Sequence, residues 1–238
     1  MNYQRRFVTL YYKVLFMSEQ NSIRPDHTGG QPLETLQDIK RIMERSSRFI
    51  SLSGLSGIAA GIFALAGAWF AYGLIDNYYN QYTNYGYSVK DFQGLKLKLM
   101  LIAISVLMIA LLTSFYFTWH RARQNQIKFW DHTSKRLLIN MLIPLIAGGI
   151  FILAMLQHDE WRYVAPACLI FYGLSLVNAS KYTFSDVRYL GLLQIVLGLI
   201  NTQYIGYGLY FWAAGFGVLH IFYGFVMWWK YERILKVV

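Results

Sequence analysis

Charge is scarce in this chain and is absent from long parts of it. Only 14% of the 238 residues are charged, whereas soluble globular domains have about 25%. Five stretches of at least 18 residues contain no Asp, Glu, Lys or Arg: Phe49–Ile75, Leu99–Trp119, Leu137–His158, Tyr163–Ser180 and Tyr189–Trp229. A bilayer core needs about 20 apolar residues per helix, so the last stretch predicts two helices and the others one each. The sequence excludes a soluble globular domain and predicts an all-α, polytopic membrane protein with six transmembrane helices.

Reactive groups are also few. The single cysteine, Cys168, excludes an intramolecular disulfide and a cysteine metal cluster. No Asp, Glu, Lys or Arg occupies the middle of an expected span, although such residues mark proton relays and coupled transport. No stretch spells a recognisable catalytic, cofactor or nucleotide-binding motif. We therefore expect a protein that is not an enzyme, with no catalytic residue, metal site or cofactor.

The charges that are present are distributed unevenly. If the N-terminus is cytoplasmic, 18 of the 22 basic and 8 of the 12 acidic residues fall on the cytoplasmic side, which therefore carries the whole net charge of +10. Cytoplasmic segments of membrane proteins carry this excess of Lys and Arg, so both termini are predicted to be cytoplasmic. The basic segments are then expected to face anionic lipid headgroups rather than nucleic acid.

The part of the chain before the first span has two segments. Residues 1–32 read as a flexible or interfacial lead-in, in which Met17 is an alternative start to Met1. In residues 33–53 the apolar side chains recur at helical spacing and charged side chains fill the other positions. This pattern predicts an amphipathic cytoplasmic helix, interpreted as a membrane-surface anchor in preference to a partner-binding helix. Residues 54–230 form the six-helix domain and 231–238 a cytoplasmic tail.

Small residues and proline predict features of the packing. Gly57 and Gly61 in the first span have the small-xxx-small spacing that lets helices approach closely in lipid. Pro144, followed by Gly148 and Gly149, predicts a bend in the third span.

Short internal repeats suggest a tandem architecture. IAAGIFALA at 58–66 returns as IAGGIFILA at 146–154, and IFYG at 170–173 returns at 221–224. Odd spans thus resemble odd spans and even spans resemble even ones. This is the trace that three tandem two-helix hairpins would leave.

Neutral polar residues within the expected spans are the candidates for a site. The five selected as lining one polar cavity are Asn178, Gln194, Asn201, His220 and Tyr223. The alternative, which we prefer, is that they form hydrogen bonds between helices, typically about 0.6 kcal/mol each. No second histidine lies at the depth of His220, so a bis-histidine haem is not expected.

Two runs resemble known sequences. The run LETLQDIKRIMERSSRFISLSGLSGIAAGIFAL, Leu33–Leu65, resembles a group of uncharacterised bacterial inner-membrane proteins with a cytoplasmic lead helix and six spans. The run SDVRYLGLLQIVLGL, Ser185–Leu199, is similar as well. The resemblance implies a bacterial inner membrane and no established activity, so it transfers no functional residue.

Two functions are compatible with these patterns. The first is a scaffold, sensor or partner-binding subunit whose contact surface is the helix 33–53 with the loop 121–136. The second is a carrier or channel for a small neutral or weakly polar solute, using Gln194, Asn201, His220 and the bend at 144–149. The expected partners are the anionic bilayer surface and a cytoplasmic protein. The sequence is also compatible with a homo-oligomer.

Overall fold

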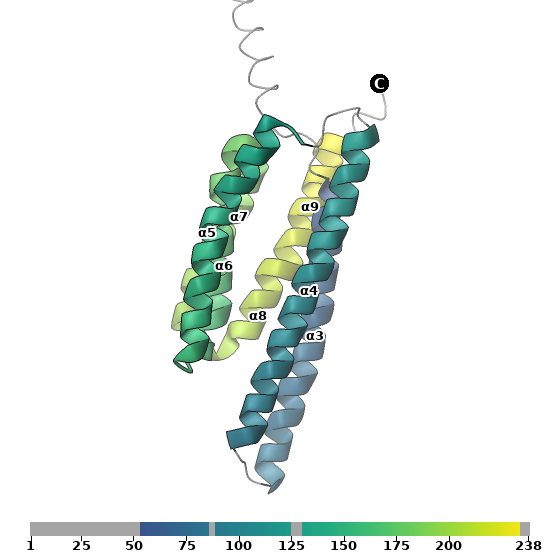
Figure 1. Cartoon of the computed structure of the whole chain (residues 1–238). Coiled ribbons are helices and arrows are strands. Elements are labelled where there is room, and N and C mark those ends of the chain that lie inside the picture. Colours follow the sequence, from purple (N-terminus) through teal and green to yellow (C-terminus); the bar gives the residue numbers. More distant parts are fainter. Residues whose placement is uncertain (1–52, 86–88, 125–129, 234–238) are drawn as a thin grey trace, which may run out of the picture. The chain divides into compact units, whose positions relative to one another are not determined.

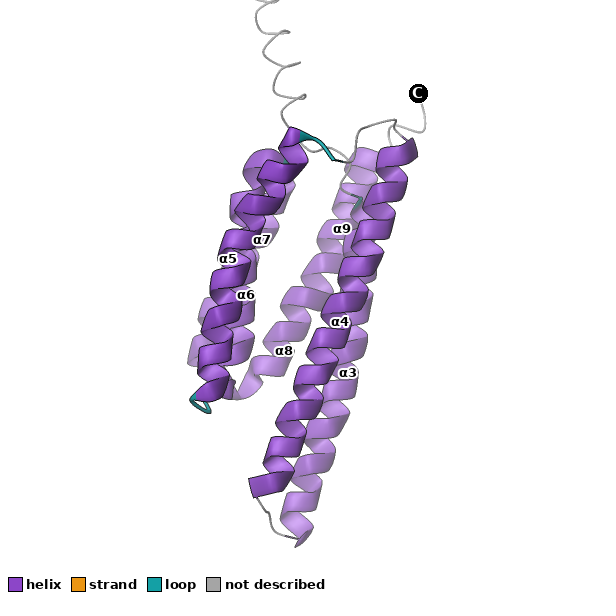
Figure 2. Cartoon of the chain, in the orientation of Figure 1, coloured by secondary structure: helices purple, strands orange, loops and turns teal. Residues whose placement is uncertain are grey.

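The computed structural model describes residues 53–85, 89–124 and 130–233, all within one compact unit, Ser47–Val238. In these residues every regular element is a helix (Figures 1 and 2). The predicted helix at 33–53 lies outside them except for Ser53, as do residues 125–129 of the predicted contact loop.

Five long helices precede a composite one. They are α3 (Gly54–Tyr85), α4 (Val89–Gln124), α5 (His132–Gln157), α6 (Val164–Ala179) and α7 (Asp186–Gln203). The 3-10 turns η2 (Trp161–Tyr163) and η3 (Ser180–Tyr182) flank α6. The composite C-terminal helix has five segments: the 3-10 turn η4 (Ile205–Tyr207), α8 (Gly208–Trp212), the π-helix η5 (Ala213–Leu219), α9 (His220–Trp228) and the π-helix η6 (Trp229–Arg233).

Five helices are long and apolar enough to cross a membrane, which indicates a multi-pass membrane protein. They are Gly54–Gln81, Phe92–Gln124, His132–Gln157, Trp161–Tyr182 and Ile205–Tyr231. The helix α7 has 18 residues but is more polar, with Asp186 and Arg188 in its first turn. Its turn into the C-terminal helix falls at Tyr204, inside the uncharged 41-residue run in which the sequence predicted two helices.

Each helix has a small set of neighbours (Figure 1). The helix α6 packs against both α5 and α7, and α4 packs against α3. The C-terminal helix packs mainly against α3 and also contacts α6 and α7. The first two predicted hairpins therefore pack as pairs. The third is not a separate packing unit, because α7 packs more extensively against α6 and the C-terminal helix against α3.

Glycines explain these two preferences. A Cβ atom added at Gly173 would lie 2.6 Å from the Gly191 carbonyl oxygen, so α6 and α7 touch backbone to backbone. A Cβ atom at Gly61 would lie 2.7 Å from the Gly217 carbonyl oxygen, which places α3 equally close to the C-terminal helix. The predicted packing role of Gly61 is confirmed, since only small residues allow this approach.

The helices α3 and α4 are longer than a bilayer requires. With 32 and 36 residues, they span about 48 and 54 Å at 1.5 Å per residue, against a hydrocarbon core of about 30 Å. The tyrosine-rich stretch after Ile75 continues α3, where Asn80 Nδ2 donates to Asp76 Oδ2 over 3.1 Å. This i to i+4 contact supports the helix beyond the apolar span.

Side-chain contacts tie the helices together at both ends. At the end where α4 and the C-terminal helix finish, Lys230 Nζ lies 3.0 Å from Asp186 Oδ2, and the Tyr231 hydroxyl donates to the same carboxylate over 2.7 Å. At the opposite end Lys96 pairs with Asp159, and the Phe92 ring contacts that of Trp161 at a 5.4 Å centroid distance.

Candidate functional site

The first polar contact within the membrane-spanning helices lies where Pro144 interrupts α5. Proline has no N–H, so the carbonyl of the residue four positions earlier, Asn140, loses its helical partner. Asn178 Nδ2 on α6 donates to this Asn140 oxygen over 2.8 Å. One turn earlier on α6, the Ser175 hydroxyl donates to the Met141 oxygen over 3.0 Å. Asn178 thus pairs the oxygen that Pro144 leaves free, and Ser175 adds a second hydrogen bond from α6 to α5.

The second polar contact surrounds the π-helix η5. The Gly215 carbonyl oxygen accepts from Gln194 Nε2 over 2.8 Å and lies 3.0 Å from His220 Nδ1. A carbonyl oxygen has two lone pairs and can accept both hydrogen bonds. On the other side of the imidazole, Nε2 lies 2.8 Å from the Tyr172 hydroxyl. Three helices therefore converge on one turn of irregular backbone.

These contacts specify the histidine tautomer. The Gly215 carbonyl can only accept, so His220 Nδ1 carries the hydrogen, and Nε2 accepts from the Tyr172 hydroxyl. Gln194 Nε2 and His220 Nδ1, 3.5 Å apart, are then two donors on the same oxygen rather than partners. The network runs from Tyr172 through His220 to the backbone and contains no charged group.

Three polar atoms on α7 have no such partner. Among the described residues no hydrogen bond reaches Gln194 Oε1 or either polar atom of the Asn201 amide. Both side chains have no exposed surface. Asn201 lies two turns beyond Gln194, where its Oδ1 would be 4.0 Å from a Cβ atom added at Gly208. Unpaired polar atoms at such depth are uncommon, because each costs about 1–3 kcal/mol.

The five residues selected from the sequence occupy three different places. Gln194 and His220 meet at Gly215, and Asn201 lies on the same helix beyond them. Asn178 belongs to the contact with α5. Tyr223 packs against a cluster of buried apolar side chains, Leu176, Val187, Leu190 and Met227. The structure thus groups Gln194 with His220 and separates the others.

The Gly215 carbonyl was not identified from the sequence. Hydropathy does not distinguish an α-helical turn from a π-helical one, and a backbone oxygen leaves no residue-type signature. Tyr172 and Ser175 were recognisable only as neutral polar residues on α6. Helical spacing alone could not show which neighbour each one contacts.

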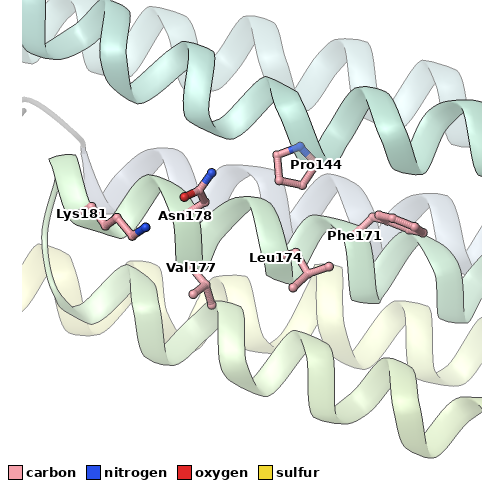
Figure 3. Close-up of a pocket in the computed structure, with 6 residues that line it drawn as sticks. All are labelled: Pro144, Phe171, Leu174, Val177, Asn178 and Lys181. Carbon is pink, nitrogen blue, oxygen red and sulfur yellow. The ribbon is translucent and has the colours of Figure 1, made fainter.

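An open groove crosses the surface of α6 (Figure 3). Its volume is about 340 Å³, and it is lined by Pro144, Phe171, Leu174, Val177, Asn178 and Lys181. A second groove of about 720 Å³ follows α3 and α4 and is lined almost entirely by apolar side chains such as Phe63, Trp69 and Val106. Within residues 53–233, apart from the gaps in the description, no group of three His, Cys, Asp or Glu residues could hold a metal ion.

No family model, curated protein or solved structure matches the chain. Chemical interpretation therefore depends on the described geometry. The polar groups around Gly215 are neutral donors and acceptors, and they hold helices together through backbone oxygens.

Proposed function

We propose that the chain is a non-enzymatic membrane protein that acts as a scaffold, sensor or partner-binding subunit. The observation that carries this proposal is the use of intramembrane polar side chains. Asn178, Ser175, Gln194 and His220 all contact backbone oxygens of other turns or helices. Such side chains serve architecture, and interaction with a partner then falls to the charged surface outside the membrane.

The proposed topology has six spans in a bacterial inner membrane, with both termini cytoplasmic, and α7 is the fifth of them in chain order. The excess of basic residues on one side supports it. An alkaline phosphatase fusion after Arg123 is expected to be inactive. An active fusion would reverse the orientation.

One proposed contact surface lies at the ends of α4 and α5, and the predicted helix at 33–53 is a second proposed contact. The basic side chains of Arg123 and Lys135 are exposed on the first surface, at opposite ends of the connection between α4 and α5. Their charge suits an acidic surface on a cytoplasmic protein.

In-cell photocrosslinking tests this surface. A photoreactive amino acid at Arg123 or Lys135 is expected to give one discrete protein adduct, and the same residue at exposed Asn80, beyond the other end of the apolar span, is expected to give none. Charge reversal at both basic positions should abolish the adduct without changing the amount of membrane-inserted protein. Absence of a discrete adduct, or the same adduct from Asn80, counts against the proposal.

A second candidate is a carrier or channel for a small neutral or weakly polar solute. It is favoured by the unpaired amide atoms of Gln194 and Asn201, which are buried within the helix group. Purified protein in liposomes should then increase the permeability of the membrane to such a solute, and Asn201→Leu should remove the increase. Equal permeability with and without the protein contradicts this candidate.

A further inference from the structure

The geometry points to a binding site for one anionic phospholipid in the groove over α6, with the phosphate beside Lys181 and an acyl chain along the apolar wall. Lys181 lies at one end of the groove and Phe171 at the other (Figure 3). Leu174 and Val177 line the part between them. The inference does not depend on the proposed partner-binding function.

The length of the groove suits one leaflet. Lys181 lies ten positions after Phe171, which corresponds to about 15 Å along a helix. Half of a hydrocarbon core of about 30 Å has the same thickness. Lys181 lies at the end of the apolar span Trp161–Tyr182, so its ammonium group is at the level of the lipid headgroups while Phe171 is near the bilayer centre.

Charge at the groove's end favours an anionic headgroup over a zwitterionic one. The hydrogen bond from Asn178 to the Asn140 oxygen fixes the antiparallel register of α5 and α6. Arg136 precedes Asn140 by one turn and Lys181 follows Asn178 by about one turn, so the two basic residues lie at the same level. The packing of η3 against α5 supports this register.

The nearby charges leave this end of the groove positive. Arg136, Lys135 and Lys181 have exposed side chains, and none has a salt bridge among the described residues. The acidic residue at this end of α5, Asp131, accepts a hydrogen bond from the His132 N–H and caps the helix. A phosphate beside Lys181 therefore has the Arg136 guanidinium at the same level, whereas Lys135 lies about half a turn around α5 from Pro144 and Asp186 is paired with Lys230.

Pro144 forms part of the apolar wall. It lies inside α5 and lines the groove together with Leu174 on α6. The side chain of Leu174 is 42% exposed. An acyl chain in the groove covers this apolar surface.

Native mass spectrometry of the full chain tests the site. The protein is transferred from detergent into nanodiscs with equal amounts of palmitoyl-oleoyl phosphatidylglycerol and phosphatidylcholine and is then released. We expect one phosphatidylglycerol to be retained per chain, at least about five-fold more often than phosphatidylcholine. Lys181→Gln and Arg136→Gln should each lower its retention about five-fold, the effect of one basic group near an anionic headgroup.

Two matched controls separate the site from general attraction. Arg188→Gln removes an exposed positive charge from the first turn of α7, at the same end of the helices as Lys181. It should leave the retention of phosphatidylglycerol unchanged. Leu174→Trp fills the groove and should remove the bound lipid, whereas Leu192→Trp, at a position with nearly equal exposure of 43%, should not.

Three results overturn the inference. One is equal retention of the two lipids, which indicates non-selective annular lipid. Another is an equal loss with Arg188→Gln or Leu192→Trp, which indicates a response to total charge or to bulk. The third is competition by inorganic phosphate together with unchanged binding in Leu174→Trp, which indicates an anion site without a chain-binding groove.

Discussion

Helical regularity is broken at two places, at Pro144 in α5 and at η5 in the C-terminal helix. The neighbouring helices supply hydrogen bonds to the two places in different ways. At Pro144 a single helix, α6, supplies both polar side chains, Asn178 and Ser175. At η5 the side chains come from α6, α7 and α9, and all converge on Gly215 and its histidine. The hydrogen bonds at the first break therefore connect two helices, and those at the second connect three.

The two breaks also differ in how completely polar groups are paired. The Asn140 oxygen freed by Pro144 has an amide donor. Beside η5, Gln194 Oε1 has no partner among the described residues, and neither does the amide of Asn201 two turns away. Polar side chains in the membrane thus serve structure at the first break, while α7 keeps unused hydrogen-bonding capacity next to the second.

His220→Ala should have the largest effect on stability. It removes the ring that connects Tyr172 to Gly215, leaves a cavity and deprives the tyrosine hydroxyl of its acceptor. We expect a loss of about 2–4 kcal/mol in the free energy of unfolding, measured by reversible denaturation in mixed micelles. Tyr172→Phe, which removes only the hydroxyl, should cost about 1 kcal/mol. Equal costs for the two variants would show that the imidazole itself contributes little.

Asn178→Leu should cost about 1–2 kcal/mol, because it leaves the Asn140 oxygen unpaired in a partly buried interface. The test is a double-mutant cycle with Pro144→Ala. Alanine restores the N–H that the Asn140 oxygen needs within its own helix, so the cost of Asn178→Leu should fall by at least half. If the effects of the two substitutions add, Asn178 does not compensate for the hydrogen bond that the Asn140 oxygen loses at Pro144.

Ser175→Ala should cost only about 0.6 kcal/mol, a typical value for a hydrogen bond between membrane helices. Its acceptor, the Met141 oxygen, has a helical partner in residue 145 and is not freed by the proline. The same cost is therefore expected with and without Pro144→Ala. If the cost of Ser175→Ala changes with Pro144→Ala, the proline also weakens the hydrogen bonding of the Met141 oxygen.

Asn201→Leu should be neutral or stabilising, the opposite sign from Asn178→Leu. The two changes are chemically identical, but Asn201 has no hydrogen bond to lose among the described residues. Unfolding of the two variants under the same conditions compares them directly. Destabilisation by more than about 1 kcal/mol would show that the Asn201 amide has a partner in the membrane.

The sequence was most informative where one residue type has one physical consequence. Pro144 predicted a break in the hydrogen bonding of its helix, because a missing N–H acts in any environment. Gly61 predicted a close helix contact for a similar reason. Neither residue could identify its neighbour, since several small or polar residues on other spans fit equally well. For Asn178 the sequence favoured a hydrogen bond between helices over a cavity, but it could not name the Asn140 oxygen as the acceptor.

The sequence by itself determined that this chain consists of apolar helices long enough to cross a membrane, because runs without charge can be tolerated only where backbone groups pair internally. Tertiary structure decided which helices touch, where the last helix becomes a π-helix, and which polar groups meet. These outcomes depend on distances between residues far apart in the chain. His220 and Tyr172, 48 positions apart, become partners only because glycine-mediated packing brings their helices together.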